Sequence, residues 1–141
     1  MVSFDDVKII GLTTTLIDYK LAFAINEKLG IRLVRYNDIL SYDGDLYPFF
    51  HYDSGENDNA YNLISINENG KKWIKLPIQT DFLFVIRNFI TEDALNEKIT
   101  AIRSIPYISY TYEIDLDSND ETGEVVECIE LHETSIFSGN D

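Results

Sequence analysis

Residues 82–88 have the sequence Phe-Leu-Phe-Val-Ile-Arg-Asn, a run that is apolar until its last two positions. A strand of this composition needs apolar cover on both faces, which predicts a place in the middle of a sheet. Thr91 is a good N-cap residue followed by two acidic residues, and Pro106 ends the helix that this signal predicts. Residues 107–117 then alternate apolar and polar side chains, as a strand with one buried face does.

The first third of the chain has the same order of elements. A β-branched apolar run at residues 7–12 predicts a strand. Residues 16–29 contain neither Pro nor Gly and place a broad set of apolar side chains on one helical face. Gly30 stands where a helix commonly ends, and residues 31–36 predict the next strand. The chain is therefore expected to contain two β-α-β units.

Further strands are expected between these two units. Residues 47–52 are rich in aromatic side chains. Residues 61–67 and 72–76 flank Asn69-Gly70, a pair that favours a tight hairpin turn. Two β-α-β units separated by strands predict an α+β fold, with an antiparallel or mixed sheet and two helices on one face, loosely ferredoxin-like. One domain is expected over residues 1–133.

Acidic residues gather near the C-terminus. The 141-residue chain has 25 acidic and 11 basic residues and a net charge of −14, and no Lys or Arg follows Arg103. Glutamates recur every third residue in this part, which is a helical spacing, but its Val and Ile residues favour a strand. We therefore expect residues 124–132 to form a hairpin with the preceding strand, and residues 134–141 to be a mobile tail.

Composition also narrows the compartment and the classes of partner. Cys128 is the only cysteine, which rules out an intramolecular disulfide and favours a reducing compartment. No apolar run approaches the roughly 20 residues of a membrane span. A net charge of −14 opposes nucleic acid and anionic membranes, because both attract proteins through Lys and Arg. We expect a cytoplasmic protein without nucleic-acid or membrane partners.

Few residues could support catalysis. The chain has two histidines, neither with a second histidine at metal-ligand spacing, and it has no phosphate-binding loop, nucleophile-elbow or paired-cysteine motif. Residues 115–126 begin like a calcium loop but lack its Gly and its final Glu. We therefore predict no catalytic residue, no metal and no cofactor, and an enzyme is the least favoured class.

One group of residues is a candidate for contact with a small ligand. His51 and Tyr52 lie in the aromatic segment, while Arg32 and Arg35 are basic residues on the predicted strand at residues 31–36. Arg87, on another predicted strand, is the third such arginine. These arginines could hold an anion, but pairing with the abundant carboxylates of the chain is the favoured alternative.

Another group is a candidate for contact with protein. Leu16, Tyr19 and Phe23 form a second apolar group on the first predicted helix, roughly opposite its main apolar face. Such a patch often marks a contact surface, although the C-terminal segment or a loop could equally cover it. The first prediction of function is therefore a non-enzymatic interaction domain that forms a homodimer or binds an unknown protein. The alternative is a small-ligand-binding or regulatory module.

The helix and strand at residues 16–35 resemble the N-terminal part of the IPExxxVDY family, small proteins of Bacteroidetes-type bacteria with no assigned activity. Asp18-Tyr19 and the Leu29-Gly30 ending carry most of this resemblance. Ile74 and Asp81-Phe82 fall at the spacing of Ile and Asp-Tyr in the naming motif, where Lys and Leu replace Pro-Glu. The resemblance implies an uncharacterised bacterial protein and no catalytic residue.

Overall fold

The computed structural model describes residues 6–55, 58–118 and 120–137. Its main feature is a six-stranded antiparallel sheet with the strand order β2-β3-β4-β7-β1-β8. The strands are β1 (Val7–Thr14), β2 (Val34–Leu40), β3 (Leu46–Asp53), β4 (Ala60–Ser65), β7 (Phe82–Arg87) and β8 (Ile108–Ile114). The predicted α+β class is confirmed, and the sheet is antiparallel rather than mixed.

The apolar strand β7 lies inside the sheet, between β4 and β1. Its side chains alternate between two cores. Phe82, Phe84 and Ile86 join the core on one face, and Leu83 and Val85 join the core on the other. The central position expected for residues 82–88 is therefore confirmed. Both faces of this strand are buried, as its apolar composition requires.

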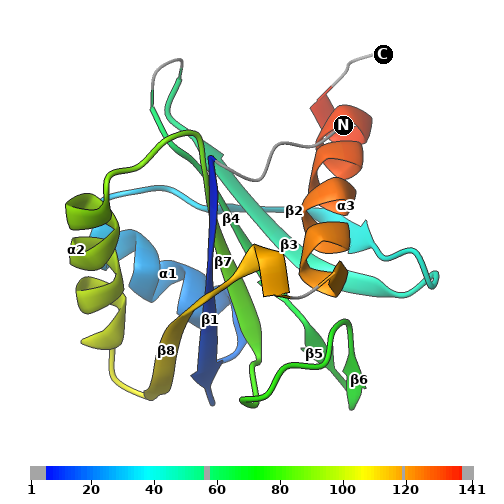
Figure 1. Cartoon of the computed structure of the whole chain (residues 1–141), viewed down its shortest axis with the longest axis horizontal. Coiled ribbons are helices and arrows are strands. Elements are labelled where there is room, and N and C mark those ends of the chain that lie inside the picture. Colours follow the sequence, from blue (N-terminus) through cyan, green and yellow to red (C-terminus); the bar gives the residue numbers. More distant parts are fainter. Residues whose placement is uncertain (1–5, 56–57, 119, 138–141) are drawn as a thin grey trace.

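Three α-helices of the described residues cover the sheet: α1 (Asp18–Leu29), α2 (Glu92–Arg103) and α3 (Asp120–Phe137). Figure 1 shows α1 and α2 on one side of the sheet and α3 on the other. Gly30 ends α1 in the left-handed conformation at φ 67°, and the Thr91 hydroxyl accepts a hydrogen bond from the Ala94 N–H at the start of α2. The end of α1 and the start of α2 are as predicted, whereas α1 begins at Asp18 rather than at residue 16. Among the described residues no helix is long and apolar enough to cross a membrane.

The two predicted β-α-β units are spread across the sheet. β1 lies between β7 and β8, so the two strands that flank α2 are not neighbours. The strands that flank α1, β1 and β2, are separated by β7, β4 and β3. That the fold is loosely ferredoxin-like stays a prediction, and the prediction of two helices omitted α3.

The C-terminal prediction was wrong, because residues 124–132 are part of the helix α3 and not of a strand. Four side chains of this helix pack into the core that α3 covers, while the glutamates at every third position face outward until Glu133. Burial of one helical face outweighs the strand preference of Val and Ile, which is only a weak propensity. The helix α3 runs through Phe137, so residues 134–137 are helical, and the expected mobility of residues 134–141 stays a prediction; residues 138–141 lie outside the described residues. The four buried apolar side chains are Val125, Val126, Cys128 and Ile129, and the polar Thr122 of the same helix is also buried.

The strand β8 departs from strict alternation. Ile108 packs against the core under α1 and α2, but Tyr112 and Ile114 belong to the core under α3. The pairing with β1 shifts at this point, where Thr13 faces Tyr110 and Thr14 faces Ile108. Such a bulge adds one residue and reverses the faces on either side of it, which explains why Ile108 and Tyr112 pack into opposite cores.

Other strand bounds also differ from expectation. The second strand begins at Val34 rather than at residue 31, and Ile31 and Leu33 are buried before it starts. The Asn69-Gly70 turn is present, with both residues at positive φ, but it joins only the short strands β5 (Asn67–Glu68) and β6 (Lys71–Lys72). The predicted strand at residues 72–76 therefore ends almost at once.

A close approach in the sheet gives a first prediction. A Cβ added at Gly11 would lie 2.7 Å from Cε1 of Tyr112, whose hydroxyl oxygen lies 2.6 Å from that of Thr80. Gly11→Ala should therefore lower the free energy of unfolding by about 1–3 kcal/mol, the usual cost of overpacking, as measured by urea unfolding. The same substitution in a Tyr112→Leu background should cost much less. Equal costs in both backgrounds would contradict the steric explanation.

Candidate functional site

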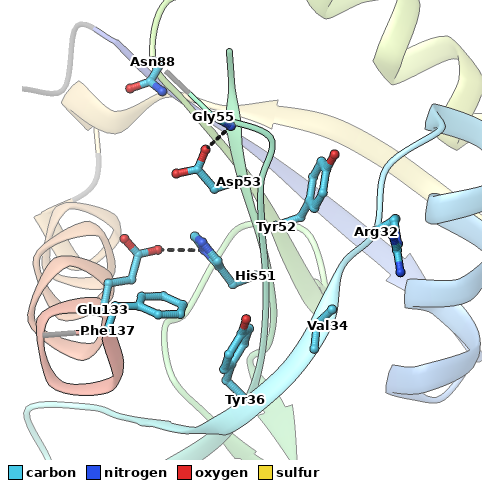
Figure 2. A pocket seen from close by; sticks show the side chains of 10 residues that line it. All are labelled: Arg32, Val34, Tyr36, His51, Tyr52, Asp53, Gly55, Asn88, Glu133 and Phe137. Carbon is cyan, nitrogen blue, oxygen red and sulfur yellow. Dashed lines mark hydrogen bonds and ion pairs between the residues drawn. The ribbon is translucent and has the colours of Figure 1, made fainter. Parts of the chain in front are cut away.

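An open cavity of about 730 Å³ lies at one end of the sheet, where β2 and β3 meet the last turns of α3. Figure 2 shows Glu133 and Phe137 reaching from α3 toward His51 of β3, with Tyr36 of β2 below them. His51 is the most buried of these groups, with 10% of its side chain exposed. The size of the cavity is typical of sites that bind small molecules.

The register of the sheet divides this cavity into two halves. His51 pairs with Asn62 of β4 and shares with it the face that α3 covers. Tyr52 follows His51 directly, so it points to the opposite face, where it stacks on Tyr61 at 6.3 Å. Figure 2 shows Arg32 on the other side of β3 from Glu133, the side to which Tyr52 points. We call these parts the α3-side half and the α1-side half.

Three donors converge on one carboxylate oxygen in the α3-side half. Glu133 Oε2 lies 2.6 Å from Nη2 of Arg87, 3.0 Å from Nδ1 of His51 and 3.3 Å from Nδ2 of Asn62. Arg87 and Glu133 are each less than one-fifth exposed. We call these four residues the Glu133 cluster. They come from β3, β4, β7 and α3, so the cluster ties the helix to three strands.

The Glu133 cluster sets the hydrogen position on the His51 ring. A carboxylate only accepts hydrogen bonds, so Nδ1 of His51 is the donor to Glu133, and in the neutral ring Nε2 is the acceptor. Asn62 Nδ2 is 3.1 Å from the same Nδ1, but two donors do not bond to each other, so the amide hydrogens go to Glu133 and to the Phe50 carbonyl. Within residues 6–55, 58–118 and 120–137, no hydrogen bond is made by Nε2 of His51 or by Oε1 of Glu133.

The Glu133 carboxyl is held ionised by its neighbours. Burial raises the pKa of this group, but the hydrogen bond from His51 and the charge of Arg87 outweigh burial, and the pKa is lowered below its ordinary value of 4.5. The cluster also has two buried atoms without a hydrogen-bond partner in the described part of the chain, Asn62 Oδ1 and Arg87 Nε. It is therefore a charged and incompletely paired group beside an open cavity.

This pKa predicts how stability depends on pH. Because the pKa of Glu133 is lower in the folded state than in the unfolded chain, its contribution to stability is fully present above pH about 4.5 and is lost as the pH falls through the lower folded pKa. Urea unfolding should show wild type more stable than Glu133→Gln at neutral pH, with the difference shrinking only in that acidic range. A difference that persists unchanged at pH about 2 would contradict the assignment.

The candidate residues from the sequence fall into different places. Arg32, His51 and Tyr52 line the cavity. Arg35 does not, because its guanidinium is 2.9 Å from Asp18 and 2.6 Å from Asp38. Arg35 therefore pairs with carboxylates of the chain, as the sequence favoured. Arg87 likewise pairs with Glu133.

Sequence reasoning missed Glu133 and Asn62. Glu133 lies between the predicted strand at residues 124–132 and the predicted tail at residues 134–141, so no pattern in the sequence indicated that its carboxylate lies near His51. The spacing of glutamates every third residue was the available signal of a helix, and a helix that packs on the sheet brings its less exposed glutamate to the strands. Asn62 gave no signal, because a polar residue in a strand is usually exposed.

The proposed protein-contact group is only partly exposed. Tyr19 and Phe23 are 60% and 67% exposed, and Ile17 beside them is 51% exposed. Leu16 is half-buried and packs against the core under α1 and α2. The C-terminal helix α3 lies on the other face of the sheet, so it does not cover these residues.

The other reactive residues are accounted for locally. Cys128 is buried, and burial, followed by the charge of Glu124, raises the pKa of its thiol to about 11. Nε2 of His132 lies 2.8 Å from the Asn37 carbonyl oxygen. No cluster of three or more His, Cys, Asp or Glu side chains suited to a metal ion occurs in the described ranges.

Comparison with known proteins adds no assignment: no protein-family model, no curated protein and no solved structure matches the chain.

Proposed function

We propose that the protein is a small-ligand-binding or regulatory module and that the cavity beside the Glu133 cluster is its binding site. The observation that carries this proposal is the orientation of His51. Glu133 fixes the Nδ1 side of the ring, which leaves Nε2 without a partner in the described chain at the edge of a cavity of about 730 Å³.

The composition of the cluster favours binding over a purely structural role. An ion pair that serves only stability gains from full hydrogen bonding, because partly satisfied buried networks are costly. Here Glu133 Oε1 and His51 Nε2 are both unpaired within the described residues, and both belong to side chains that line the cavity. These groups are suited to orient a ligand.

The remaining expectations are part of the same proposal. We propose a non-enzymatic bacterial protein of the cytoplasm, without nucleic-acid or membrane partners, on the grounds of its charge and its single cysteine. The resemblance to the IPExxxVDY family and the loosely ferredoxin-like description also stay proposals, and neither assigns a role to a residue.

A ligand screen tests the proposal. A library of small polar molecules, followed by thermal shift, should give a hit that raises the melting temperature of the wild type. His51→Gln should weaken the effect of that hit, whereas His132→Gln, at the histidine outside this cavity, should leave it unchanged. The absence of any hit, or hits that both variants weaken equally, would contradict the proposal.

A second candidate function is self-association through α1. It is supported by the exposure of Tyr19 and Phe23, which are adjacent apolar groups on one helix. Sedimentation should show a dimer that Tyr19→Glu and Phe23→Glu each dissociate. Phe89→Glu, at a 72% exposed aromatic residue elsewhere, is the matched control and should leave the dimer intact. A monomeric wild type would remove this candidate.

A further inference from the structure

We infer that the α3-side half of the cavity binds a small cation with N–H donors, such as an ammonium or amidinium group. This inference rests on the proposed function, because it names the ligand class of the same site. The hydrogen-bonding groups that line this half, the placement of charge and the aromatic rings all favour such a ligand.

Most of the polar atoms left over in the α3-side half accept hydrogen bonds; the Tyr36 hydroxyl, which can donate or accept, and the second amide hydrogen of Asn88 are the exceptions among its lining groups. Nε2 of neutral His51 and Oε1 of Glu133 are free within the part of the chain described. Asp53 uses Oδ1 to accept from the Gly55 N–H, which leaves its other oxygen, and Asn88 donates through Nδ2 to the Asp58 carbonyl, which leaves its amide oxygen. A group that only donates hydrogen bonds, as ammonium and amidinium do, matches such a lining.

The charges are arranged for the same kind of ligand. Arg87 is occupied by Glu133 at 2.6 Å, so its charge is already paired. Asp53, an exposed carboxylate at the same half, has no ion pair among the described residues. The cation that remains on the cavity wall is Arg32, and it lies in the α1-side half (Figure 2). The net charge of −14 further raises the local concentration of small cations over anions.

Aromatic rings complete the α3-side half. Phe137 and Tyr36 meet edge to face at 5.1 Å, and the His51 ring lies 5.0 Å from Phe137. Phe137 is 47% exposed, so its ring is available to a ligand. Cations are attracted to the faces of aromatic rings, and a flat amidinium can also stack on them.

Three probes of similar size separate the ligand classes: benzamidine, benzyl alcohol and benzoate, which are cationic, neutral and anionic. Binding is measured by the shifts of the His51 and Phe137 ring signals in NMR titrations up to about 10 mM, which detects millimolar complexes. Benzamidine should bind at least about tenfold more tightly than the other two probes.

The same titration with variants tests the residues. Asp53→Asn should weaken benzamidine about fivefold, the scale of one partly exposed charge pair. Asp43→Asn removes an exposed carboxylate from the β2–β3 turn and gives the chain the same net charge as Asp53→Asn does, so it is the matched control and should leave the affinity unchanged. Equal effects of the two variants on the affinity for benzamidine would overturn the inference. They would show that the net charge of the chain, and not Asp53, attracts the probe.

The probes also distinguish failure of the inference from failure of the proposed function. If benzoate binds more tightly than benzamidine and loses affinity in Arg32→Gln, the site takes anions in its α1-side half, which overturns the cation inference and keeps the binding site. If benzyl alcohol binds as well as benzamidine, charge recognition is overturned alone. If no probe shifts either ring, the inference fails and the screen above decides the proposed function.

Discussion

Arg87→Met should lower the free energy of unfolding by about 3 kcal/mol, measured by urea unfolding at neutral pH. The substitution keeps the apolar stem of the side chain and removes the guanidinium 2.6 Å from Glu133. A carboxylate that is only 18% exposed then loses its countercharge, and removing one partner of a buried ion pair typically costs about 3–5 kcal/mol. Because Arg87 and Glu133 are both partly exposed, the expected cost lies at the lower end of this range.

The double variant Arg87→Met, Glu133→Gln is the control. Gln keeps the size of the side chain and an oxygen that can accept from His51, but it has no charge to compensate. The double variant should therefore be more stable than the sum of the two single costs predicts, by about 1 kcal/mol or more. Additive costs would show that Arg87 and Glu133 do not interact, which would contradict the cluster.

Ile129→Ala should lower the free energy of unfolding by about 2–5 kcal/mol, while Leu131→Ala should change it by less than about 0.5 kcal/mol. Both residues belong to α3, where Ile129 is fully buried and Leu131 is 63% exposed. The two residues are two positions apart, so a helix places them on nearly opposite sides, whereas a strand would place them on the same face. The pair therefore separates the observed helix from the strand that the residue types favour.

Similar costs for Ile129→Ala and Leu131→Ala in the same urea series would contradict the helix. Because Glu133 belongs to the same helix, such a result would also remove the placement of its carboxylate beside His51.

Segments with local signals could be predicted from the sequence. Gly30 and Thr91 mark helix boundaries through their own backbone or side-chain chemistry, and both act as expected. The apolar composition of residues 82–88 by itself predicts that both faces of the strand are buried. In each case the physical cause lies within a few residues of the effect, so no knowledge of the tertiary structure is needed.

The α3 helix could not be predicted with the same security. Val125 and Val126 prefer strands as isolated residues, and only the core on the α3 side of the sheet offers a surface that a helical face can bury. The local and the tertiary preferences conflict here, and burial prevails.

The candidate site was partly predictable. His51, Tyr52 and Arg32 were chosen because unusual residue types lie in or near an aromatic segment, and all three line the cavity. Their division between two halves follows from the alternation of β3, which the sequence contains. The cluster itself depends on contacts between residues 46 and 71 positions apart, from Glu133 to Arg87 and Asn62, which no local pattern encodes.

The central claim is that Glu133 fixes His51 so that Nε2 faces the cavity as an acceptor. The most direct test is the ¹⁵N chemical shifts of the two His51 ring nitrogens in wild-type protein at slightly alkaline pH. We predict a neutral ring with the proton on Nδ1 and a bare Nε2, and a loss of this preference in Glu133→Ala, which removes the acceptor for Nδ1–H. A ring with its proton on Nε2, or one with both nitrogens protonated at that pH, would contradict it.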